Sequence, residues 1–156
     1  MGLFSRRSAA TDAASPPRLR EIGDPEREWI AAHVELVTRT GANVDDLDAI
    51  RLRYEQMLAS WRRINPPERD DPDVMINAIG TAFGEHLIRT APLRWMLADD
   101  EQGTELAVYE PRRPMLLYPA KLVAERWTAE DPSGDFLTAI SGEVATAYPR
   151  GRRGRH

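Results

Sequence analysis

An acid and a histidine stand side by side at one place in this sequence where they could do chemistry together. Glu85 and His86 follow Gly84 within a helical pattern. Neighbouring residues of a helix point about 100° apart, so the two side chains do not converge on their own. A zinc metalloprotease helix needs two histidines four residues apart, and the sequence lacks that pattern. We keep Glu85 and His86 as catalytic candidates, with a pair on the helix surface as the simpler interpretation.

Three consecutive acids form the second candidate group. Asp99, Asp100 and Glu101 precede Gly103, and carboxylate oxygens are the ligands that hard divalent cations prefer. The alternating ligand spacing of a calcium-binding loop is missing. Aspartate and glycine are also turn residues in their own right, so a solvated hairpin turn is the favoured interpretation. Trp95 is a further ligand or partner candidate, because a tryptophan on a strand can leave its ring lining a groove.

Other catalytic and cofactor sites lack their signatures. The chain has no cysteine and three histidines, which excludes thiolate nucleophiles and leaves little for a metal. Gly80 and Gly84 are not a phosphate loop, since they lie within a helical pattern and no Gly-Lys-Ser/Thr ending follows. Ser141 lacks the elbow motif of serine hydrolases. We predict no metal and no cofactor, and we favour a non-enzymatic protein while an enzyme using Glu85 and the 99–101 acids stays open.

The elements that would position these residues begin with three helices. Asp24 and Pro25 start the first helix, and Gly41 ends it. The second helix, over 47–64, has an apolar stripe spaced 3, 4, 3, 4, 3, which could serve the core or a homodimer interface: Leu47, Ile50, Tyr54, Met57, Trp61 and Ile64. The third helix starts near Asp73 and ends at Thr90. Its Gly80 and Gly84 would each cost about 1 kcal/mol relative to alanine, so we expect a strand or the second helix to approach closely there.

The following segment predicts strands and then helices. Strands are expected at 93–97, 104–109 and 115–118, with turns at 99–103 and 111–114 between them. Pro119 opens a short helix to Trp127, and an amphipathic helix ends near Tyr148. The order favours one α+β domain over 24–148, with a helical pair on an antiparallel three-stranded sheet. We expect a disordered leader at 1–23, a basic disordered tail at 149–156, and core positions for the four tryptophans.

From Ile76 to Trp127 the chain resembles a family of uncharacterised bacterial domains of unknown function. The resemblance is carried by residues 77–85, by Leu93-x-Trp95, by residues 99–107 and by the helix that starts at Pro119. It implies an α+β domain of bacterial origin and no particular activity. It makes Glu85, Trp95 and Asp99 the first positions to test.

Charge and composition complete the functional hypothesis. Residues 1–20 carry a net +3 and residues 150–156 a net +4, so the body between them carries −11. An acidic body would be repelled by a phosphate surface, and this disfavours nucleic-acid binding apart from contact through the arginine-rich tail. No apolar run is long enough for a secretory signal or a membrane span. We expect a cytoplasmic module that binds a protein partner or a small molecule. A specialised form of this hypothesis is an immunity-type protein whose acidic face caps a basic partner.

Overall fold

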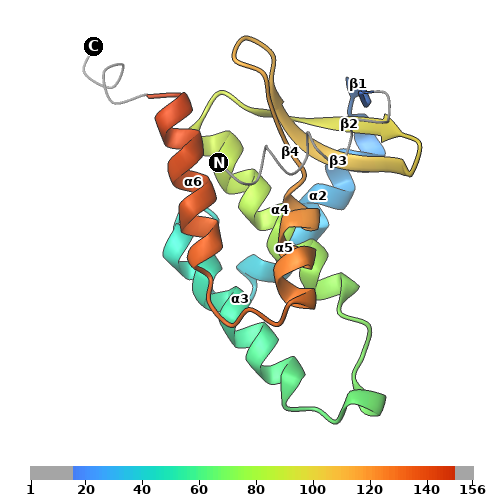
Figure 1. Ribbon diagram of the computed structural model, residues 1–156, viewed down its shortest axis with the longest axis vertical. Coiled ribbons are helices and arrows are strands. Elements are labelled where there is room, and N and C mark those ends of the chain that lie inside the picture. The colour runs from blue at the N-terminus through green and yellow to red at the C-terminus, as the bar shows by residue number, and fades with distance from the viewer. Residues whose placement is uncertain (1–15, 150–156) are drawn as a thin grey trace.

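An antiparallel sheet lies across one end of a group of helices in the computed structural model, which describes residues 16–149 (Figure 1). Most of the predicted tail, residues 150–156, and most of the predicted leader, residues 1–15, lie outside the described residues. The elements are β1 (Arg18–Glu21), α2 (Asp24–Thr38), α3 (Leu47–Arg62), a 3-10 turn η1 (Pro66–Glu68), α4 (Asp73–Thr90), β2 (Arg94–Asp100), β3 (Gly103–Glu110), β4 (Met115–Leu117), α5 (Pro119–Thr128) and α6 (Asp135–Ala147). The α+β class and the single domain are as predicted.

The sheet has four strands in the order β1-β2-β3-β4, one more than the sequence predicted. The extra strand, β1, falls within the residues that we assigned to a disordered leader. Its residues pair with the far end of β2, from Arg18 opposite Asp99 to Glu21 opposite Met96. A four-residue strand has too little periodicity to be seen in the sequence. Its partner lies more than 70 residues further along the chain, so tertiary pairing defines it.

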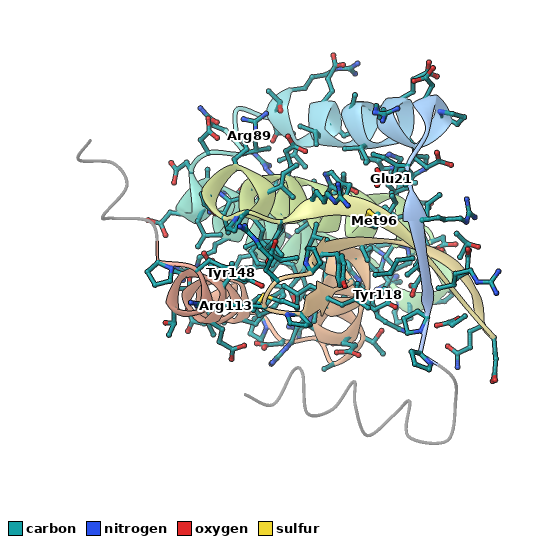
Figure 2. All side chains as sticks on the ribbon, turned by 90° about the horizontal axis from the view of Figure 1, so that it is seen from above. Glu21, Arg89, Met96, Arg113, Tyr118 and Tyr148 are labelled. Carbon is teal, nitrogen blue, oxygen red and sulfur yellow. The ribbon has the colours of Figure 1, made fainter. Side chains whose placement is uncertain are left out.

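Helix α4 is the centre of the helical layer. It packs against α2, α3, α5 and α6 and also against β2 and β3. Viewed from above, α2 and α5 lie on opposite sides of it (Figure 2). Ten of its residues between Ile76 and Leu87 are buried, which is the pattern of a helix covered all round rather than on one stripe. The five α-helices that the sequence predicts are present in residues 16–149, but in place of a helical pair α4 packs against all four of the others.

The apolar stripe of α3 belongs to the core of this chain. Ile50, Tyr54 and Leu58 are at most 1% exposed, and the stripe packs against α4 and α6. The hydroxyl of Tyr54 donates to the carbonyl of Asp131 (2.8 Å), and its ring meets those of Trp127 and Phe136 edge to face. Burial, together with the nearby Asp131 carboxylate, raises the pKa of Tyr54 to about 12. Ile50 and Tyr54 of this stripe thus lie in the core, whereas Ile64 at its end is 40% exposed, and a homodimer through the 47–64 helix stays a prediction.

Gly80 allows the backbones of α4 and α5 to approach closely. A Cβ atom at Gly80 would lie 2.5 Å from the Cα atom of Ala120 and 2.8 Å from its nitrogen. The expected close backbone approach is confirmed here, but the partner is the start of α5 rather than a strand or the second helix.

The tryptophans divide between core and surface. Trp127 and Trp95 are 2% and 8% exposed and belong to the core, and Trp61 packs against it partly buried. The core prediction is wrong for Trp29, which is 38% exposed. Trp29 stacks on His33 one turn away in α2, so its ring covers the surface of its own helix instead of entering the core.

None of the helices among residues 16–149 is both long and apolar enough to cross a membrane.

The hairpin turn between β2 and β3 is shorter than the predicted turn at 99–103. Asp100 pairs with Gly103, so Glu101 and Gln102 alone form the turn. Asp99 and Asp100 are the last residues of β2, where antiparallel pairing extends the strand beyond its apolar residues.

The turn between β3 and β4 is held by a buried carboxylate. Glu110 is 4% exposed and its Oε1 accepts the N–H groups of Arg112 (2.8 Å) and Arg113 (3.2 Å). Burial alone would raise the pKa of Glu110, but these two N–H groups and the Arg112 guanidinium outweigh it and lower that pKa. The hydroxyl of Tyr148 donates to the Arg113 carbonyl (2.5 Å), which ties the end of α6 to the same turn (Figure 2).

A Glu110→Gln variant should lose stability at pH 7 and lose less of it in acid. Because the pKa is lower in the folded state, the carboxylate stabilises the fold above its unfolded pKa of about 4.3. That contribution disappears as the pH falls through the folded-state pKa. Urea unfolding at pH 7 and near pH 3 measures the difference between variant and parent. Glu101→Gln in the exposed hairpin is the control, and an equal deficit for Glu110→Gln at both pH values contradicts the prediction.

Candidate functional site

Glu85 and Trp95 meet where α4 passes beneath β2. The indole Nε1–H of Trp95 donates to Oε1 of Glu85 (3.2 Å), and the carboxylate is 19% exposed. The other oxygen of Glu85 accepts from Nε of Arg89 one turn along the helix (3.2 Å). Arg89, labelled in Figure 2, also donates to Asp45 (3.1 Å). Two of the candidate residues are thus in direct contact, and Glu85 acts as a hydrogen-bond acceptor for an indole and a guanidinium.

The structure does not bring Glu85 and the acidic residues of the hairpin together. Asp99 lies four residues beyond Trp95 on β2, which is roughly 13 Å along a strand. It accepts from Nε of Arg20 (2.6 Å) and from the hydroxyl of Thr104 (2.5 Å). These hydrogen bonds, with the positive charge of Arg20, lower the pKa of Asp99. Asp99 therefore connects β1, β2 and β3. The sequence does not predict this role, because Arg20 lies in the segment that we assign to a disordered leader.

Asp100 and Glu101 serve the hairpin turn. Oδ1 of Asp100 accepts the N–H of Gln102 (2.8 Å), while Glu101 is exposed at the turn. Among the described residues, no group of three or more His, Cys, Asp or Glu side chains is placed to hold a metal ion. In the described chain the acidic turn has the geometry of a capped hairpin, the interpretation that the sequence favoured.

His86 lies on the opposite side of α4 from solvent. It is 6% exposed, and its Nδ1–H donates to the carbonyl of Val44 (2.7 Å) in the loop before α3. The adjacent Glu85 points toward Trp95, so the two neighbours have separate partners, as the helical geometry predicts. His86 thereby connects α4 to the loop that leads into α3.

A cavity of about 270 Å³ opens beside Trp95, between α4, the sheet and the start of α5. Three aromatic residues line it: Trp29 from α2, Trp95 from β2 and Tyr118 just before α5. Its remaining lining residues are Asn77, Thr81, Leu97, Thr104, Glu105, Leu106, Pro119, Ala120 and Lys121. We call this the aromatic cavity. Trp95 lines this cavity, while its role in binding a ligand or partner stays a prediction.

Gly84 makes room for the indole of Trp95. A Cβ atom at Gly84 would lie 2.3 Å from the Cη2 atom of that ring, so the indole rests directly on the α4 backbone. The second glycine of the pair thus accommodates a side chain from a strand, whereas Gly80 accommodates a helix backbone. Together they set the positions of Trp95 and of the start of α5, both of which border the aromatic cavity.

Trp95 also lines a second, more open groove of about 530 Å³ between α2 and α4. Its floor is apolar, with Ile22, Ile30 and Val34, and its rim carries two arginines and two glutamates: Arg27, Arg89, Glu35 and Glu85. Charges on this rim are already paired, since Glu35 lies 3.3 Å from Arg39 and Arg27 lies 3.2 Å from Asp24. The groove therefore offers apolar surface without an evident charge preference.

The fold and its cavities define a small α+β domain built around one buried helix. The chain belongs to the family described as a domain of unknown function, DUF3806, whose model matches residues 52–135. The resemblance expected over 76–127 is therefore confirmed, and the match extends through most of α3 and to the start of α6. No curated protein and no solved structure matches the chain.

Sequence reasoning missed most of the residues that line the aromatic cavity. Trp29 was expected in the core, and Asn77 and Thr81 looked like ordinary positions of a helix. Lys121 carried one available signal, because it is the sole lysine in a chain whose other basic residues are arginine and histidine. No rule of sequence spacing connects residues from five elements, so the tertiary structure alone places them around one cavity.

Proposed function

We propose that the protein is a non-enzymatic, cytoplasmic module that binds a small molecule in the aromatic cavity. The observation that carries the proposal is the meeting of three aromatic residues from three parts of the chain around a space of about 270 Å³. Ligand sites are concave, mostly apolar and supplied with a few polar groups, and a space of this size fits a small ligand. Aromatic walls favour a flat partner.

The partners of the acidic candidates support a binding role over catalysis. Glu85 accepts from Trp95 and Arg89, and Asp99 accepts from Arg20 and Thr104. Each carboxylate is thus already engaged by donors of the described chain. The donors to Asp99 lower its pKa and favour its charged form, whereas a general acid must hold a proton near neutral pH. Glu85 instead orients the indole that forms one wall of the cavity.

The four tryptophans allow a direct test. Each indole N–H gives its own signal in a ¹H–¹⁵N NMR spectrum, assignable by single Trp→Phe variants. Indole, a neutral flat probe, should shift the signals of Trp29 and Trp95, which line the aromatic cavity, and leave those of Trp61 and Trp127 in place. A shift of Trp95 without Trp29 would place the probe in the α2–α4 groove, and a probe that shifts neither would refute the proposal.

Trp29→Ala should weaken binding of the probe by about fivefold, because one aromatic contact is lost. The matched control is Leu52→Ala, which shortens an exposed apolar residue on α3, away from the cavity lining. Both side chains are more than a third exposed, so both variants should fold. Equal affinities for the two variants would contradict the assignment of the site.

A further inference from the structure

The start of α5 presents unpaired hydrogen-bond donors to the aromatic cavity. The first N–H groups of a helix have no partner within the helix, and here the preceding residue, Tyr118, supplies no side-chain cap. Leu122 N–H bonds back to the Tyr118 carbonyl (3.0 Å), and Pro119 has no N–H. The N–H groups of Ala120 and Lys121 make no hydrogen bond with any of residues 16–149, and both residues line the cavity. A ten-residue helix thus begins at the cavity with two donors available.

A nearly buried threonine on α4 is the second, independent observation. Thr81 lines the same cavity and is 3% exposed, yet its hydroxyl makes no hydrogen bond within the described part of the chain. By contrast, the hydroxyls of Thr38, Thr90 and Thr146 each donate to a carbonyl in the preceding turn of their own helix. The Thr81 side chain is almost wholly enclosed and bonds to nothing else in the described part of the chain, so its hydroxyl is free to pair with a ligand in the cavity.

Lys121 and Asn77 add further donors. The Lys121 ammonium lies 5.7 Å from the centre of the Tyr118 ring, and its carboxylate neighbour Glu105 is 3.9 Å away, at the limit of an ion pair. The side-chain amide of Asn77, one turn before Thr81 on α4, makes no hydrogen bond within residues 16–149 and also lines the cavity. The positive end of the α5 dipole lies at the same place.

From this arrangement we infer that the cavity binds a small organic anion, with its acid group at the start of α5 and its flat apolar body against the aromatic walls. The inference rests on the proposed function and names the class of ligand. Two backbone N–H groups, a hydroxyl, an amide and an ammonium form a set dominated by donors, which matches the acceptor oxygens of a carboxylate or a phosphate. The one carboxylate among the lining residues, Glu105, faces the Lys121 ammonium at 3.9 Å, so its negative charge is partly offset at the cavity.

The experiment compares acids with their neutral amides on the full chain. Indole-3-acetate and benzoate are titrated in parallel with indole-3-acetamide and benzamide, and inorganic phosphate is the third arm. Backbone NMR signals report the site, and the Ala120 and Lys121 N–H signals should shift with the acids. Because the chain has a single lysine, reductive methylation with ¹³C-formaldehyde labels Lys121 and the α-amino group alone, which gives a side-chain reporter.

Thr81→Val removes the hydroxyl at nearly constant shape, and Lys121→Gln removes the charge. Each should weaken binding of the acids by about tenfold, the loss expected for a hydrogen bond to a charged group, and should leave binding of the amides nearly unchanged. Thr146→Val is the matched control, because its hydroxyl is exposed on α6 and satisfied by the Gly142 carbonyl. Its affinity for the acids should equal that of the parent.

The outcomes separate this inference from the proposed function. Acids that bind at least tenfold tighter than their amides and shift Ala120 and Lys121 support it. If acids and amides bind in the cavity with equal affinity, the inference that the ligand is an anion is refuted, while the proposed binding of a small molecule still holds. If phosphate binds as tightly as the aromatic acids, the inference that the ligand is organic is refuted, and an inorganic anion is the ligand instead. If no probe of any arm shifts Trp29 or Trp95, the proposed function and the inference both fail.

Discussion

A Gly80→Ala substitution should destabilise the protein by about 3 kcal/mol, although alanine is the better helix former by about 1 kcal/mol. The added methyl would lie 2.5 Å and 2.8 Å from the backbone Cα and nitrogen of Ala120 and 3.1 Å from the carbonyl carbon of Pro119. All three atoms are backbone, so no side-chain rotation relieves the overlap. Helix α5 would have to move away from α4, and its start would leave the aromatic cavity.

Urea unfolding of the variant and the parent measures this difference. The control is Gly142→Ala on α6, where no atom lies within 4 Å of the position of a new Cβ atom. There the gain in helix propensity should appear unopposed, as a stabilisation of about 1 kcal/mol. Gly80→Ala behaving like Gly142→Ala would show that α4 and α5 are not in the described contact.

Gly84→Ala should cost about 2 kcal/mol for a different reason. Its methyl would lie 2.3 Å and 2.7 Å from two carbon atoms of the Trp95 indole, a ring that is 8% exposed and bonded to Glu85. A rigid ring in a packed core cannot move without disturbing its neighbours. The loss of stability therefore comes from the contact between residue 84 and the Trp95 ring rather than from the helix propensity of residue 84.

A double-mutant cycle isolates that pair. In a Trp95→Leu background the ring is gone, so Gly84→Ala should become neutral or stabilising, since the helix propensity of alanine is then the main remaining difference. The effect of the same substitution thus changes sign between the two backgrounds. A similar loss with tryptophan and with leucine at position 95 would refute the contact between the ring and the α4 backbone.

Local patterns were sufficient to predict most of the elements and the family. The starts of α2 and α5 followed from Asp24-Pro25 and from Pro119, because proline is favoured in the first turn of a helix. The two glycines of α4 indicated a close approach, because an uncompensated glycine is costly in a helix. They did not name the partners, since α5 and the Trp95 ring come from later parts of the chain.

The candidate site was predicted in one part and missed in another. Trp95 was singled out and lines two cavities. Asp99 was singled out for its acidic neighbours, whereas in the structure its partner is Arg20 from β1, about 80 residues earlier in the chain. Thr81 was not noticed, because a threonine within a helix gives no signal until its hydroxyl is seen to lack a partner. Ion pairs and unpaired donors depend on distances between elements, which periodicity does not contain.

The sequence by itself determined the α+β class, the helix starts, the paired strands around the hairpin and the membership of the family. Each depends on residues close together in the chain, where backbone preferences act directly. Only the tertiary structure decided that Ile50 and Tyr54 of α3 enter the core and that residues 18–21 add a fourth strand. It alone also decided that α2, α4, β2, β3 and α5 surround one aromatic cavity. The physical reason is that side-chain burial and hydrogen-bond pairing are settled between distant segments, after the local elements have formed.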